Sequence, residues 1–231
     1  MNHDEILKIL GTTNSPIAIG GYNLDSFDTD CQIYNLVVFD GKNLADVITK
    51  HESKIIKTSH GNISESNSET LLSYENLQII HDEQWELKTL ISKIQKKKNT
   101  LFSASAKNAL VESQLAISKA KNALEQEDPF VACWIKSGII LLIDSILYQN
   151  QILPNPVNAL SSMRTLKQKN TNQFTDKIIS ETGIERATES LLSRMLKSTC
   201  GFSDMVEKNQ NSIIIEKKAN YLIQNSLLSD C

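Results

Sequence analysis

Glycine is distributed unevenly along this chain of 231 residues, and the distribution constrains the fold more than any other feature. Five of the eight glycines lie at or before Gly61, and none lies between Gly61 and Gly138. With 8 glycines and 4 prolines, the chain has too few turn residues for a β-sandwich or a propeller. The interval without glycine predicts helices. It places a boundary between two expected domains, residues 1–97 and residues 98–231.

The first domain is expected to combine short strands with helices. Residues 33–39 (IYNLVVF) are β-branched and aromatic, which is typical of a buried strand, and Asp40-Gly41 follows as a turn. The expected elements are a helix over residues 4–10, strands over 16–20, 33–39 and 77–80, a hairpin or a short helix and strand over 45–49 and 53–58, and a polar loop over 61–68.

The second domain is expected to be a helical bundle. From Trp85 onward, small and apolar residues recur at helical spacing, and those from Phe102 to Ala123 share one face that another helix can approach closely. Asp128-Pro129 has the pattern of a helix start. The apolar run that follows is about ten residues long, whereas a membrane span needs about 20. The expected helices after Asp128 cover residues 128–150, 157–169, 174–182, 185–198 and 213–228, with Gly201 as a stop.

Charge and cysteine content restrict the class of protein. The net charge is −3 and the isoelectric point about 5.8, so a general coating of nucleic acid is not favoured. The first ten residues lack the pattern of a signal peptide. The four cysteines are far apart and form no CxxC pair, which predicts reduced thiols. A cytoplasmic protein that does not associate with membranes is therefore expected.

The candidate site begins at Gly20-Gly21, directly after the first expected strand. Such a pair either lets the backbone approach a phosphate closely or makes a tight turn. The chain contains neither GxxxxGK[ST] nor GxGxxG, so a P-loop and a Rossmann site are poor matches. Asp25, Asp28 and Asp30 follow within ten residues of the glycine pair. They are either ligands for a metal ion or ordinary loop acids, because aspartate favours turns.

A strand, Gly-Gly, a set of carboxylates and a second strand resemble the nucleotidyltransferase superfamily of the polymerase β type. The resemblance covers residues 1 to about 95. It implies that Gly20 and Gly21 hold a nucleoside triphosphate, and that Asp28 and Asp30 of Asp-Thr-Asp bind Mg²⁺. Magnesium prefers such oxygen ligands and gains affinity from phosphate. A third carboxylate is expected on a later strand, with Asp82 as the first choice and Glu75 as the second.

An alternative alignment without gaps leads to a different expectation. The family pattern then falls on residues 31–37, and the metal positions become Gln32 and Tyr34. Neither side chain is suited to hold Mg²⁺ in that role. The resemblance therefore leaves two functions open: a nucleotide-binding protein that transfers a nucleotidyl group to an unknown acceptor, and a catalytically inactive module.

The helical half is similar to the bundles that follow nucleotidyltransferase domains in kanamycin nucleotidyltransferase and in HEPN pairs. No histidine follows His81, so the Arg and His pair of HEPN ribonucleases is absent from the sequence. The helical half is expected to bind a protein partner or a second copy of the chain. Trp85 and Trp134 are expected to be core or interface anchors, and the lysine run 96–98 is expected at the end of a helix, facing its negative pole.

Overall fold

The computed structural model describes residues 14–20, 30–51, 53–155, 159–166, 171–183, 186–206, 210–228 and 231. The chain forms two compact units. One contains Met1–Lys97 and Ser198–Lys218, and the other contains Lys98–Lys197 and Ala219–Cys231. The fold is α+β, with a small mixed sheet followed by helices, as predicted. The opening helix expected over residues 4–10 lies outside the described residues.

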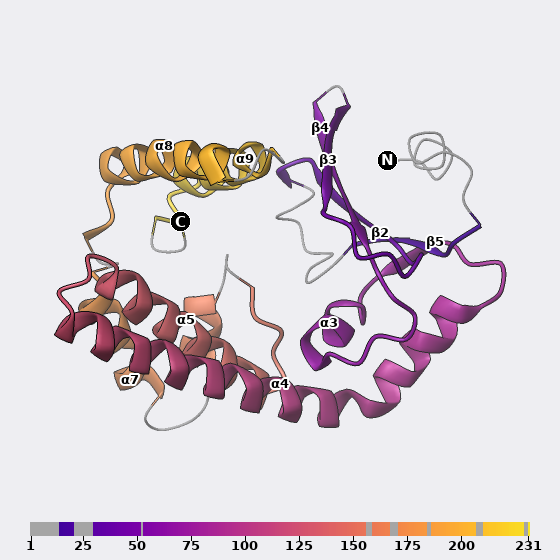
Figure 1. The fold of residues 1–231 in the computed structure, drawn as a ribbon, viewed down its shortest axis with the longest axis horizontal. Helices are drawn as coiled ribbons and strands as arrows, with labels where there is room; N and C mark the ends of the chain where they lie inside the picture. Colours follow the sequence, from indigo (N-terminus) through magenta and orange to yellow (C-terminus); the bar gives the residue numbers. More distant parts are fainter. Residues whose placement is uncertain are drawn as a thin grey trace. The chain divides into compact units, whose positions relative to one another are not determined.

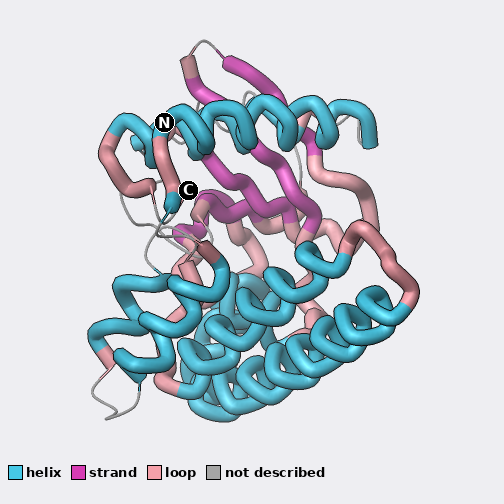
Figure 2. The backbone as a smooth tube through the Cα atoms, turned by 90° about the vertical axis from the view of Figure 1, so that its left-hand side faces the viewer, coloured by secondary structure: helices cyan, strands magenta, loops and turns pink. Residues whose placement is uncertain are grey.

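The first unit contains a five-stranded sheet with the order β3-β4-β2-β1-β5 (Figures 1 and 2). β1 pairs antiparallel with both β2 and β5, β2 pairs parallel with β4, and β3 pairs antiparallel with β4. The two expected segments 45–49 and 53–58 therefore form the hairpin alternative. The strands are β1 (Ile17–Ile19), β2 (Ile33–Val38), β3 (Val47–His51), β4 (Lys54–His60) and β5 (Gln78–His81).

β2 has neighbours on both sides and is buried on both faces, which explains its nearly continuous apolar sequence. Leu36 and Ile56 form the centre of one face, with Ile19 and Ile80 packed against them. Gly61 follows β4 at a point where a Cβ atom would come within 2.9 Å of the Val37 side chain.

The short helix α3 (Ser68–Ser73) was not predicted. Its start is fixed by Asn67, whose side chain accepts hydrogen bonds from the backbone N–H groups of Glu69 and Thr70. Asparagine is a favoured residue at this position. After α3, the Tyr74 ring packs edge-on against Phe39, at 5.0 Å between ring centres.

α4 (Glu86–Glu125) is a single helix of 40 residues. The lysine run 96–98 lies well inside it, so the expectation of a helix end there is wrong. Trp85 is 61% exposed and is not a core anchor. Trp134 is half-buried, with Lys119 Nζ 4.6 Å from its ring centre.

In the second unit, α5 (Val131–Gln149) packs against α4 through small residues, as predicted. Ser113 Oγ donates a hydrogen bond to Gly138 O, and Ser145 Oγ donates one to Ala106 O, both at 2.7 Å. By length and composition alone, α5 is apolar enough to cross a membrane, with a mean hydropathy of 1.7. About 28% of it is buried, and core helices pass the same test.

The remaining helices follow the predicted pattern with shifted ends. The predicted stop at Gly201 is wrong, because a glycine in a helix interior costs only about 1 kcal/mol, and the helix continues through it to Val206. These helices are α6 (Ala159–Thr165), α7 (Thr171–Thr182), α8 (Glu189–Val206) and α9 (Asn211–Gln224).

Candidate functional site

Gly20 and Asp30 lie at the same edge of the sheet. Gly20 follows β1, and Asp30 precedes β2 by a few residues. Because these strands are antiparallel, with Ile19 opposite Leu36, β1 runs beside the second half of β2 and its end adjoins the middle of β2. The backbone N–H of Gly20 donates a hydrogen bond to Asn35 O at 2.9 Å. We call this edge the Gly20 edge. Gly21 and Asp28, the other predicted site residues here, lie outside the described residues.

The backbone at Gly20 has φ 117°, a conformation that side chains larger than glycine rarely adopt. The glycine is therefore required by the turn that leaves β1. A turn of this kind is compatible with both interpretations of the glycine pair, because a glycine without a side chain also lets a phosphate approach the backbone closely. The Gly20 N–H itself is bonded to Asn35 O and does not face an anion.

Asp82 lies at the opposite edge from Gly20 and Asp30. β5 is antiparallel to β1 and so runs in the same direction as β2; its last residue, His81, pairs with Ile17. Asp82 follows that end. His81 lies opposite Ile17, which precedes Gly20 by three residues, so about 10 Å of β1 separates Gly20 from the end of β5 at about 3.3 Å per residue. The structure does not bring Asp82 together with Gly20 and Asp30.

The Asp82 side chain instead interacts with the start of α4. Its Oδ2 atom accepts a hydrogen bond from the backbone N–H of Lys88 at 2.9 Å. Its Oδ1 atom is buried and has no hydrogen-bond partner among the described residues. A carboxylate near the first turn of a helix is stabilised by the helix dipole, so a structural role accounts for this residue.

Glu75, the second choice for the third carboxylate, precedes β5 by three residues. The ring of its neighbour Tyr74 packs against Phe39, which follows the last residue of β2, at the end opposite Gly20. The structure therefore does not bring Glu75 together with Gly20 either. Which residues meet here depends on strand direction, and the local sequence does not show it.

Gln32 and Tyr34 occupy the metal positions in the ungapped alignment. Gln32 is exposed with φ 53°, and its carbonyl oxygen accepts a hydrogen bond from Ile55 N. Tyr34 is half-buried in β2, opposite Ile56 of β4. β4 (KIIKTSH) contains no carboxylate. Under this alignment the paired strands therefore offer no acidic ligand.

The described residues contain no group of three or more histidine, cysteine, aspartate or glutamate side chains arranged to hold a metal ion. Asp28 is not among these residues. The assignment of Mg²⁺ to Asp28 and Asp30 therefore stays a prediction.

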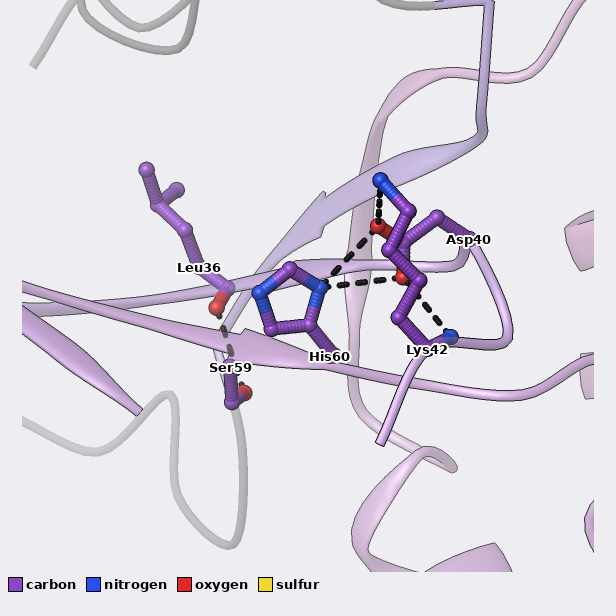
Figure 3. Close-up of polar contacts among 5 residues, drawn as sticks. All are labelled: Leu36, Asp40, Lys42, Ser59 and His60. Carbon is purple, nitrogen blue, oxygen red and sulfur yellow. Dashed lines mark hydrogen bonds and ion pairs between the residues drawn. The ribbon is translucent and has the colours of Figure 1, made fainter. Parts of the chain in front are cut away.

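At the edge opposite Gly20, the sheet brings together a cluster that the sequence analysis missed (Figure 3). β2 and β4 are parallel, and Val38 pairs with His60, so Asp40 reaches the His60 ring. The Nδ1 atom of His60 lies 2.9 and 3.0 Å from the two Asp40 carboxylate oxygens. Lys42 donates its backbone N–H to the same carboxylate at 3.1 Å, and its Nζ atom lies 3.4 Å away.

The electrostatics of this cluster favour the ionised form of Asp40. Burial opposes the charge, but the hydrogen bonds from His60 and Lys42 outweigh it, so the pKa of Asp40 falls below its ordinary value of 3.8. The pairing holds the ends of two strands together. The sequence signal was limited to a histidine two residues after the expected segment 53–58 and an aspartate just after the expected strand 33–39.

No protein-family model and no curated protein matches the chain. Its structure is similar to a solved structure described as a nucleotidyltransferase-like protein from Exiguobacterium sibiricum 255-15. The two chains are 10% identical and superimpose with a TM-score of 0.42, over 98% of this chain and 75% of the other.

Proposed function

We propose that this protein binds a nucleoside triphosphate together with Mg²⁺ at the Gly20 edge. The observation that carries the proposal is that Gly20, with its left-handed backbone, and Asp30 lie at one edge of the sheet. The short connection between them carries Asp25 and Asp28. A glycine turn lets a phosphate approach the backbone closely, and the acidic residues offer oxygen ligands for magnesium. The Gly20 N–H is already bonded to Asn35 O, so the N–H donor in this proposal is that of Gly21.

In this proposal the backbone of Gly20 and Gly21 contacts the phosphates, and Asp28 and Asp30 hold Mg²⁺. The metal ion, when bound, neutralises the charge of the phosphate oxygens. We propose binding rather than nucleotidyl transfer as the main activity, because Asp82 lies at the opposite edge and cannot orient an acceptor there. Glu75 does not take that role either, because its neighbour Tyr74 packs on Phe39 at the opposite end of β2.

The test is thermal unfolding with and without ATP and Mg²⁺. A ligand that binds only the folded state raises the melting temperature. We expect this rise for the natural protein, and we expect Asp30→Asn to reduce it. Asp82→Asn is the matched control, because asparagine still accepts a hydrogen bond from Lys88 N and the residue lies at the other edge. The proposal fails if ATP with Mg²⁺ leaves the melting temperature of the natural protein unchanged.

A second function, that of an interaction module, is favoured by one observation on α8. Phe202, Met205 and Val206 follow one another at helical spacing on one face and are 63%, 75% and 61% exposed. Apolar groups gathered in this way are typical of surfaces that another protein covers. We expect a dimer in light scattering and a melting temperature that rises with protein concentration. Phe202→Ser combined with Met205→Ser should give a monomer, and a natural protein that is monomeric at all concentrations would rule out self-association through this face.

A further inference from the structure

The first three turns of α4 have an outward face that is basic and carries an exposed tryptophan. Leu87, Leu90 and Ile94 are buried on the inner side of the helix. The residues on the outer side are all exposed: Trp85, Lys88, Thr89, Ser92, Lys93, Lys96 and Lys97. This set is called the α4 basic face below, and it belongs entirely to the unit that contains the sheet.

The charges on the α4 basic face are not compensated within the described residues. Lys93, Lys96 and Lys97 have no ion-pair partner there. They also lie three and four positions apart, a spacing at which like charges destabilise a helix by about 0.2–0.5 kcal/mol per pair. Asp82, Glu83 and Glu86 are the acids near this end, and the next acid along α4 is Glu112.

This arrangement is unusual for a chain with a net charge of −3. A helix end would have explained the lysine run by its dipole, but the run lies inside α4. The repulsion between these lysines destabilises the helix, and no contact among the residues that the structure describes offsets it. Such a departure from the most stable sequence is expected at residues that serve in binding. A partner with closely spaced negative charges would compensate these lysines.

Trp85 adds a second chemical requirement. Its side chain is 61% exposed, although tryptophan is normally highly buried. The Nζ atom of Lys88 lies 4.1 Å from the ring centre, so the indole is held beside the lysines. An exposed aromatic ring next to a basic stripe is the combination that binds single-stranded nucleic acid, where bases stack and phosphates pair with lysine.

We propose that the α4 basic face binds single-stranded nucleic acid, with Lys93, Lys96 and Lys97 on the phosphates and Trp85 stacked on a base. An anionic membrane fits less well, because an amphipathic helix binds lipid through its apolar side, and here that side is buried. An acidic protein segment would pair with the lysines but would leave Trp85 unused. The surface is independent of the nucleotide site proposed at the Gly20 edge.

The test uses the full chain and a fluorescein-labelled single-stranded 12-mer of uridine or thymidine. Binding is measured by fluorescence anisotropy at a series of salt concentrations, and EDTA is present to remove divalent metal ions. For single strands the logarithm of affinity falls with that of salt by about 0.7 per neutralised phosphate. The triple variant K93Q/K96Q/K97Q should therefore reduce the salt slope by about 2. Trp85→Ala should weaken binding about fivefold or more without changing the salt slope, because it removes the stacking ring but no charge. Trp85→Phe, which keeps an aromatic ring, should retain most of the affinity of the natural protein.

Two controls separate this proposal from a general charge effect and from the nucleotide site. K119Q/K121Q removes two lysines from the far half of α4, where Lys119 stacks on Trp134 and Lys121 precedes Glu125 by four residues. This variant should bind normally, and so should Asp30→Asn. The proposal is overturned if the 12-mer does not bind, if K119Q/K121Q loses as much affinity per charge as the triple variant, or if Trp85→Ala has no effect. Binding of phosphatidylserine vesicles or polyglutamate in place of the 12-mer would also overturn it.

Discussion

At the scale of single residues, Asp40 and His60 form the polar contact whose contribution to stability can be predicted with a definite sign. The Asp40 side chain is 11% exposed and the His60 side chain 15%, so solvent screens the pair only weakly. The pKa of Asp40 is lowered in the folded protein, against burial, by His60 and Lys42. The ionised carboxylate therefore stabilises the fold above pH 3.8, and this contribution is lost as the pH falls through the lower folded pKa.

We predict that Asp40→Asn lowers the free energy of unfolding at pH 7 by about 1–3 kcal/mol, as is typical for hydrogen bonds to a charged group. The difference from the natural protein should shrink as the pH falls from 3.8 through the lower folded pKa of Asp40, because the aspartate then becomes neutral, as the asparagine is. Urea unfolding, monitored by circular dichroism at several pH values, measures this difference in the free energy of unfolding.

Asp46→Asn is the control for this measurement. Asp46 forms an ion pair with Lys57 at 2.8 Å, but both side chains are more than a third exposed. Exposed pairs contribute little, so we expect a change below about 0.5 kcal/mol. Equal losses in the two variants, or a loss in Asp40→Asn that does not depend on pH, would contradict the role given to the Asp40 and His60 pair.

At the scale of elements, most strands and helices were predictable because their signals are local. β2 is a β-branched and aromatic run, and α5 ends within one residue of the prediction, at Gln149. α3 was missed because its six residues carry little periodicity, although Asn67 marks its start. The stop at Gly201 failed because one glycine in a helix interior costs only about 1 kcal/mol, which is too little to end a helix of 18 residues.

The contact between α4 and α5 depends on small residues, and this dependence leads to a prediction. Ala116 is buried, and it would lie 3.6 Å from a Cβ atom built on Gly138. We predict that Ala116→Leu destabilises the protein by about 1–3 kcal/mol, because a larger side chain forces the helices apart. The melting temperature should fall by about 2–10 °C.

Gln114→Leu is the matched control on the same helix, because Gln114 is exposed and receives the same new side chain. Its effect should stay within about 0.5 kcal/mol, as for most surface changes. If Ala116→Leu melted at the same temperature as Gln114→Leu, the predicted packing of small residues between the helices would be wrong.

At the scale of the whole molecule, the sequence predicted which part has a sheet and which part is helical, because the gap in glycine coincides with that change. It did not predict which elements meet. The Asp40 and His60 contact, the separation of Asp82 from Asp30, and the grouping of residues 198–218 with the sheet all depend on strand direction or on contacts between distant segments. A local pattern carries no information on either.

The grouping of residues 198–218 with the sheet has a measurable consequence. Lys217 Nζ donates a hydrogen bond at 2.8 Å to Ser53 O, in the turn between β3 and β4. A chain that ends at residue 197 loses this segment, whereas a chain that ends at residue 218 loses only residues of the other unit.

We predict that amide hydrogens of β3 and β4 exchange about tenfold faster or more in the 1–197 chain than in the full chain, because local opening becomes easier. The 1–218 chain should exchange at these strands like the full chain, although α9 is shortened. Exchange measured by mass spectrometry decides the matter: equal rates in the 1–197 and 1–218 chains would show that the C-terminal segment does not stabilise the sheet.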